Sequence, residues 1–140
     1  MGADHLRRPL RDGKGRSRPL TPVIRPQSAS AIGPQVQETF RKAYKAGVKI
    51  AFGTDCGVSP HGTNAREFLL MNEAGMPPLE TIQAATLRPA QLLGVENETG
   101  TLTAGKEADI VATPADPSQD LSTVMNVSFV MSDGVVYKRP

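Results

Sequence analysis

The pattern of apolar and polar residues predicts one long helix followed directly by a strand. Beyond Gln35 apolar residues recur at helical spacing, with Gln, Glu, Arg and Lys between them: Val36, Phe40, Ala43 and Tyr44. Gly47 is typical of a helix end. The next run, Val48–Phe52, is β-branched and aromatic, and it leads into Gly53-Thr54-Asp55. A helix, a glycine and then a strand are typical of an α/β protein with a parallel sheet.

Two shorter helices are expected after a loop of Gly, Ser and Pro residues. Thr63 and Asn64 have side chains that suit a helix N-cap, so we expect them to begin a helix that ends near Ala74. Pro77 and Pro78 are tolerated in the first turn of the next helix. Helical spacing predicts that this helix buries Leu79, Ile82 and Ala85 or Thr86.

The C-terminal third changes to strands that follow one another without intervening helices. Val127, Phe129 and Met131 alternate along the chain at strand period. Asp133-Gly134 then separates this run from Val135–Tyr137, and Asp-Gly between apolar runs is a strong hairpin signal. Two further short strands are expected earlier, at Gly100–Leu102 and Ala108–Ala112. The sequence therefore predicts a second layer, distinct from the α/β part.

These patterns divide the chain into a leader and two structural regions. Residues 1–22 contain six basic residues and three prolines with few apolar side chains, so we expect a basic, disordered leader. Residues 23–94 form the α/β region, and residues 95–140 form the region of strands. Binding of nucleic acid through the leader is the weaker alternative to a solvated tail, because no aromatic residue is interleaved with its basic residues and no motif is recognised.

Composition excludes several classes of protein. The 140 residues, 39% hydrophobic and 21% charged, suit one ordinary domain. The longest stretches without a charged residue, 26–37 and 121–132, are shorter than the about 20 apolar residues of a membrane-spanning helix. The first residues lack the apolar segment of a signal peptide, and Cys56 is the only cysteine. We therefore expect a cytoplasmic protein with no membrane partner and no intrachain disulfide.

Asp55 is the leading candidate for chemistry. It lies where the predicted strand ends and a loop begins, and reacting groups in parallel α/β folds gather at that end of the strands. A carboxylate there can ligate a divalent metal or accept a proton from water that the metal activates. The alternative is that Asp55 only caps the loop. His61, in the same loop, is either a second functional residue or a plain surface residue, and Cys56 has no evident partner base.

Several motifs occur in a recognisable order along residues 23–140. They are Ala46–Asp55, His61–Glu67, Glu73–Met76, Ala84–Thr86, Pro89–Gly94, Gly100–Leu102, Ala104–Lys106, Ala108–Val111 and the ending Phe129–Tyr137. Together they resemble the metal-dependent amidohydrolase superfamily, in its imidazolonepropionase-like and Xaa-Pro dipeptidase (prolidase-like) branch. Within this resemblance, Ala46–Asp55 is similar to the last barrel strand of such enzymes.

The resemblance implies both a fold and a chemistry. The fold is α/β: residues 23–94 would be the C-terminal portion of a (β/α)8 TIM-like barrel, and residues 95–140 would be strands of a small β-sandwich. The implied reaction is hydrolysis of an amide or similar C–N bond in a small molecule or dipeptide, with one or two divalent metals, usually zinc. Asp55 would ligate metal, take a proton from the attacking water and deliver it to the leaving nitrogen. His61 would touch the substrate.

The chain also departs from this family. The His-x-His pair of the first strand, the bridging Lys and two further histidines have no counterpart in its sequence. A whole barrel takes about 250 residues, so we expect a C-terminal fragment that lacks most metal ligands and is inactive alone. The alternative is a non-catalytic binding or assembly module. Its unpaired strand edges and apolar faces would favour self-association or an N-terminal partner half.

Overall fold

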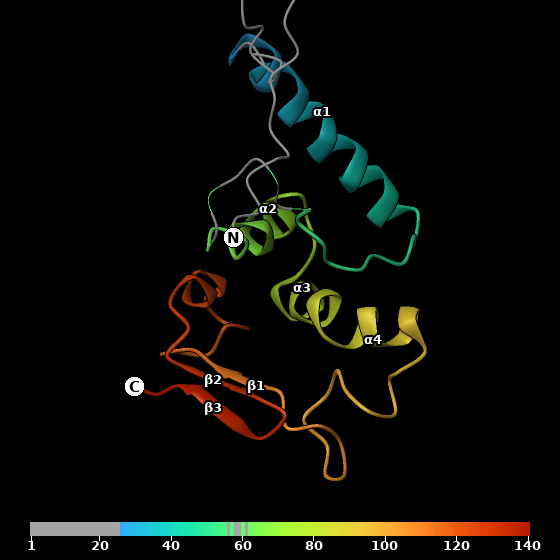
Figure 1. Cartoon of the computed structure of the whole chain (residues 1–140). Coiled ribbons are helices and arrows are strands. Elements are labelled where there is room, and N and C mark those ends of the chain that lie inside the picture. The colour runs from blue at the N-terminus through green and yellow to red at the C-terminus, as the bar shows by residue number, and fades with distance from the viewer. Residues whose placement is uncertain (1–25, 56, 58–59, 61) are drawn as a thin grey trace, which may run out of the picture. The chain divides into compact units, whose positions relative to one another are not determined.

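The computed structural model describes residues 26–55, 57, 60 and 62–140. The chain divides into two compact units, Met1–Gly33 and Pro34–Pro140, and all elements except the start of the first helix lie in the second unit. The described elements (Figure 1) are α1 (Pro26–Lys45), α2 (Arg66–Glu73), α3 (Pro78–Ala85), α4 (Leu87–Leu93), β1 (Ile110–Ala112), the 3-10 helix η1 (Leu121–Met125), β2 (Phe129–Ser132) and β3 (Val135–Lys138).

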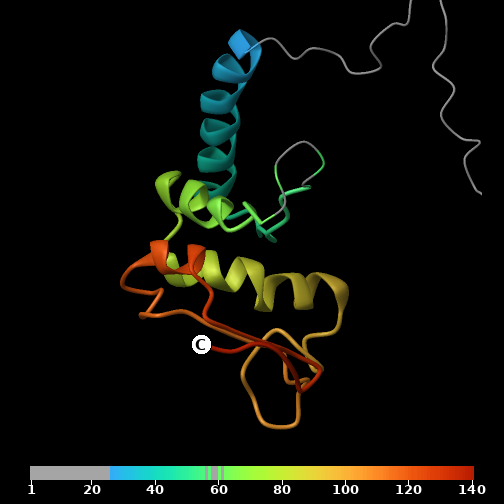
Figure 2. The same cartoon turned by 60° about the vertical axis from the view of Figure 1, so that its left-hand side comes forward.

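Helices α3 and α4 form a middle layer between α2 and the sheet (Figures 1 and 2). They follow one another almost without a break, because only Thr86 (φ −129°, ψ −81°) leaves the helical conformation between them. The 3-10 helix η1 packs against α2. No helix in the described part of the chain is both long enough and apolar enough to cross a membrane.

A small apolar core forms where α2 approaches α3. Met71 of α2, Met76 before α3 and Ala84 of α3 are buried together in this core. The partly buried residues that pack against this cluster are Phe40, Tyr44, Ile50 and Phe52. Two of the residues with predicted helical spacing, Phe40 and Tyr44, therefore face the core as expected.

The buried face of α3 differs from the predicted one. Thr81 is completely buried and Ala84 almost so, whereas Leu79 is 56% exposed. Burial of the Thr81 hydroxyl is tolerated because its Oγ1 donates a hydrogen bond to the carbonyl oxygen of Pro77 at 3.0 Å. The small side chains of Thr81 and Ala84 let α2 and α3 approach closely. Ile82 and Ala85 are only half-buried and face a pocket described below.

The predicted N-caps of α2 are also wrong. Ala65 is the N-cap residue, and no side chain caps the first turn. The carbonyl oxygens of Thr63 and Asn64 accept hydrogen bonds from the N–H groups of Arg66 and Glu67. The two side chains bond within the loop instead, because Thr63 Oγ1 donates to the Pro60 carbonyl at 2.7 Å and Asn64 Nδ2 reaches back along the chain.

Residues 48–54, called segment 48–54 below, belong to no helix or strand, and they form no ladder with another strand in the described ranges. The prediction of a sheet strand at Val48–Phe52 is therefore wrong for these residues. The physical reason is that a strand needs a neighbour, and β1, β2 and β3 pair only with one another. The segment keeps the alternation of a strand, since Ile50 and Phe52 are half-buried while Lys49 and Ala51 are exposed.

The C-terminal strands form an antiparallel sheet of order β1-β2-β3. Ile110 pairs with Met131, and Ser132 pairs with Val135 across the turn between β2 and β3. Asp133 and Gly134 have φ values of 48° and 72°, which is the conformation that a two-residue hairpin turn requires. The hairpin prediction is confirmed.

The strand predicted at Gly100–Leu102 is not formed. Gly100 has φ +88°, a left-handed conformation that interrupts a strand. It also lies so close to Ala90 that a Cβ at position 100 would be 2.7 Å from the Ala90 Cβ. The chain turns here because Gly100 packs directly against α4.

Candidate functional site

Asp55 directly follows segment 48–54. Its φ of 45° lies in the left-handed region, which aspartate enters more readily than most residues other than glycine. The residue is exposed. Because Asp55 is exposed, water, a metal ion or a substrate can reach it.

Two contacts hold the ends of the loop that starts at Asp55. Asn64 Nδ2 donates a hydrogen bond to Thr54 Oγ1 at 3.2 Å. The rings of Phe52 and Phe68 have centroids 4.6 Å apart and are tilted by 35°, a favourable geometry for an aromatic pair. Both contacts join segment 48–54, which precedes Asp55, to residues at the start of α2, which follow it.

The contact that Asn64 makes was not predicted from the sequence. Its side chain was expected to cap a helix, whereas it donates a hydrogen bond to a residue ten positions earlier. No local pattern could have indicated that contact, because it depends on the path of the intervening loop. His61 and Cys56 lie outside the described residues, so their predicted roles stay predictions.

The metal implied by the resemblance can be tested against the donors present. The oxygen atoms of Asp55 are hard ligands that suit a divalent cation. Within residues 26–55, 57, 60 and 62–140, no three His, Cys, Asp or Glu side chains lie together in a way that could hold a metal ion. A catalytic zinc takes about three protein ligands. Asp55 therefore fits one ligand position, and the described residues do not complete the site.

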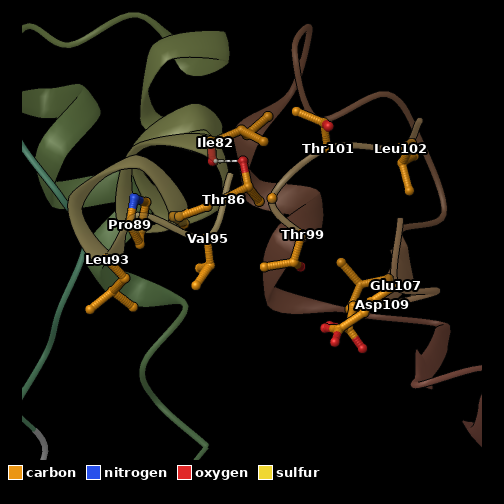
Figure 3. Close-up of a pocket in the computed structure, with 14 residues that line it drawn as sticks. Ile82, Thr86, Pro89, Leu93, Val95, Thr99, Thr101, Leu102, Glu107 and Asp109 are labelled. Atoms are coloured by element: carbon orange, nitrogen blue, oxygen red, sulfur yellow. Dashed lines mark hydrogen bonds between the residues drawn. The ribbon is translucent and has the colours of Figure 1, made fainter. Parts of the chain in front are cut away.

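A separate pocket of about 680 Å³ lies between α3–α4 and residues 95–111, and Asp55 does not line it. Figure 3 shows apolar side chains such as Pro89 and Leu93 on one side of it, with the carboxylates of Glu107 and Asp109 on the other. Asp109 Oδ1 accepts hydrogen bonds from the Asp133 N–H and from Ser132 Oγ, both at 2.9 Å.

These bonds to Asp109, the backbone N–H of Asp133 first and the Ser132 hydroxyl second, hold the pKa of its carboxyl below the ordinary 3.8. A carboxylate already bonded in this way supports the hairpin and is poorly placed to act on a ligand. Asp55 therefore remains the better candidate for a catalytic residue.

Comparison with known proteins gives consistent results. The profile of the amidohydrolase family matches residues 18–137. Ochratoxinase from Aspergillus niger is 36% identical over 108 residues, which are 74% of this chain and 22% of that protein. Imidazolonepropionase from Geobacillus sp. (strain WCH70) is 31% identical over 117 residues, which are 79% of this chain and 27% of that protein.

Solved structures show the same similarity. A Xaa-Pro dipeptidase with bound methionine in the active site superposes with a TM-score of 0.75 at 49% identity, covering 80% of this chain and 28% of that one. The structure of A. niger ochratoxinase gives a TM-score of 0.68 at 34% identity, covering 84% of this chain and 28% of that one. The chain spans about a quarter of the length of the relatives it matches.

Proposed function

The chain belongs to the amidohydrolase family, and from this premise we propose that it supplies the catalytic aspartate, Asp55, for hydrolysis of an amide or similar C–N bond. The predicted resemblance to imidazolonepropionases and Xaa-Pro dipeptidases is confirmed by relatives of both kinds. The observation that carries the proposal is the position of Asp55, exposed and with a left-handed φ of 45°, directly after segment 48–54, which is anchored to the core through Ile50 and Phe52.

Asp55 would do two things in this reaction. Its carboxylate would provide one ligand to a divalent metal, zinc in the expectation from the resemblance, which when bound acidifies water and polarises a carbonyl group. The same carboxylate would accept the proton that the attacking water loses and return it to the leaving nitrogen. His61 would contact the substrate, and the remaining metal ligands would come from outside the described residues.

The substrate class rests on the relatives. The Xaa-Pro dipeptidase, at 49% identity, favours an Xaa-Pro dipeptide, while the imidazolonepropionases favour a cyclic amide as the second choice.

The fold proposed with this function is that of the resemblance. Residues 23–94 would contribute the end of a (β/α)8 barrel and residues 95–140 would contribute strands to a β-sandwich. The helices of residues 26–93 and the antiparallel strands of residues 110–138 support that division.

Purified chain with zinc and a panel of Xaa-Pro dipeptides tests whether it acts alone. We expect no turnover above background, because the described residues do not complete a metal site. Turnover that Asp55→Asn abolishes would contradict the expectation of inactivity alone while supporting the role of Asp55.

A chimera tests the role of Asp55 directly. Residues 18–137 replace the matched region of the Xaa-Pro dipeptidase that is 49% identical. Asp55→Asn in this chimera should lower kcat by about 10²–10⁴-fold, the usual contribution of a positioned acid or base. Asp116→Asn is the matched control, since Asp116 is exposed and bonds the N–H of Ser118 in its own turn. Equal activity of both variants would overturn the proposal.

A further inference from the structure

The pocket drawn in Figure 3 has an apolar wall that is made by one face of two helices. The residues of this wall, called the helical wall below, are Ile82, Ala85, Pro89, Ala90 and Leu93. They recur every one to four positions on the same side of α3 and α4, which follow one another almost without a break. Leu93 is 75% exposed, so the described residues leave part of this wall open to solvent. Apolar surface in contact with water is surface that a ligand can cover.

The opposite side of the pocket is acidic. Glu107, Asp109 and Val111 line it at every second position, which is the spacing at which residues of a strand share one face. Among the described residues that line the pocket, Glu107 and Asp109 are the only charged ones. A pocket with an apolar wall on one side and only negative charge on the other is complementary to an apolar molecule that carries a positive charge.

The two carboxylates differ in how far the rest of the chain uses them. Asp109 Oδ1 accepts hydrogen bonds from Ser132 Oγ and from the Asp133 N–H, which fix its position beside the hairpin. The Glu107 N–H donates to the Glu98 carbonyl at 2.9 Å, but no described residue donates a hydrogen bond or an ion pair to the Glu107 carboxylate. Glu107 is therefore the carboxylate that a cation can approach, while Asp109 adds negative charge from a fixed place.

We propose that this pocket binds a small organic amine, with its ammonium group beside Glu107 and its apolar body against the helical wall. The volume of about 680 Å³ lies within the about 300–1,000 Å³ that is usual for sites of small molecules. Binding removes apolar surface of Leu93 and its neighbours from water. The acidic side then selects an amine over an uncharged molecule of the same shape. Asp55 does not line the pocket, so the amine site is independent of any catalytic role of Asp55.

A matched pair of ligands tests the selection by charge. Naphthylmethylamine is a cation at neutral pH, and naphthylmethanol has the same rings and nearly the same shape without the charge. Each is titrated into the full chain while amide signals are followed by NMR. We expect saturable shifts at Leu93, Val95 and Glu107, with a Kd of about 0.1–1 mM for the amine. The alcohol should bind about three- to tenfold more weakly, because it forms no ion pair.

A change of charge tests the acidic side. Glu107→Gln keeps the size of the side chain and removes its charge, so it should weaken binding of the amine about two- to fivefold and leave binding of the alcohol unchanged. Glu73→Gln is the matched control, since Glu73 is exposed at the end of α2 and does not line the pocket. It should change neither affinity.

A change of size tests the helical wall. Leu93→Ala shortens the wall and should weaken binding of both ligands about threefold or more, because each loses apolar contact. Leu92→Ala is the matched control, since Leu92 is the neighbouring residue, is also 75% exposed and does not line the pocket. Both leucines are mostly exposed, so both variants should fold as the unaltered chain does.

Each result either supports the amine site or overturns it. Weaker binding of the amine in Glu107→Gln and of both ligands in Leu93→Ala, with both control variants unchanged, supports it. Equal affinities of amine and alcohol overturn it, as does the absence of saturable shifts at residues that line the pocket. A doubled mass of the ligand-free chain in sedimentation, which Leu93→Ala returns to a single mass, also overturns it, because a second copy would then cover the helical wall.

Discussion

Asn64 is hydrogen-bonded to Thr54 across the loop that contains Asp55, with 3.2 Å between Nδ2 and Oγ1. Thr54 immediately precedes the aspartate, so this bond holds the end of segment 48–54 next to the start of α2. The contact links a residue just before α2 to a residue ten positions earlier in the sequence. Its removal should affect the loop more than the core.

Asn64→Ala should therefore destabilise the chain only modestly. We expect a loss of about 0.5–1 kcal/mol in the free energy of unfolding, the lower part of the range for a hydrogen bond, because the pair is exposed. Urea unfolding measures the change. Asn97→Ala is the control, since Asn97 is also exposed and its side chain makes no hydrogen bond to the described residues. Equal losses in the free energy of unfolding in the two variants would contradict a stabilising role of the hydrogen bond between Asn64 and Thr54.

The buried hydroxyl of Thr81 should matter more. Thr81→Val keeps the shape of the side chain but removes the donor to the Pro77 carbonyl, at a site with no solvent exposure. We expect a loss of about 1–2 kcal/mol in the free energy of unfolding, because a valine cannot replace the bond. The same change at exposed Thr101 should cost less. A Thr81→Val variant with the same free energy of unfolding as the unaltered chain would mean that the hydroxyl contributes no net stability.

The close approach at Gly100 predicts a large effect. In Gly100→Ala the new Cβ would lie 2.7 Å from the Ala90 Cβ and 3.0 Å from the Thr86 carbonyl oxygen. Crowding and the positive φ together should cost about 2–5 kcal/mol. Gly105→Ala has a similar φ of +91° and nothing within 4 Å of its Cβ, so it should cost only about 1–2 kcal/mol. Thermal unfolding of the two variants compares them directly.

The hydrogen bonds to Asp109 predict a dependence on pH. The Asp133 N–H and the Ser132 hydroxyl lower the pKa of this carboxyl from its ordinary 3.8 in the folded chain. The stabilisation is therefore fully present above pH 3.8 and is lost as the pH falls through the lowered folded-state pKa. Asp109→Asn should flatten this acid loss in a series of unfolding curves. Glu107→Gln, two residues earlier in the sequence, should leave the wild-type slope.

Local sequence patterns correctly predicted the elements that depend on residues close together in the sequence. The Asp133-Gly134 hairpin formed because both residues adopt the positive φ that the turn requires. The amphipathic pattern around Phe40 and Tyr44 predicted which side of α1 meets the core. The sequence also predicted that Asp55 follows a segment anchored to the core, while its catalytic role remains a proposal.

The predictions that were wrong concern features that depend on residues far away in the sequence. Val48–Phe52 has the composition of a strand, but composition does not provide the neighbour that a ladder needs. Thr63 and Asn64 are good capping residues, yet Asn64 bonds Thr54 and Thr63 bonds Pro60. Thr81 is buried because α2 packs on that face of α3, which periodicity along α3 alone could not show.

The pairing of Phe52 with Phe68 bears on how such a chain can change during evolution. The rings fasten both ends of the connection that passes through Asp55, so its length is free to vary while its end points stay in place. For loops in general, a twofold longer connection costs only about 0.6 kcal/mol more to close. Insertions between Asp55 and Asn64 should therefore leave the contact between the two rings, and with it the start of α2, in place.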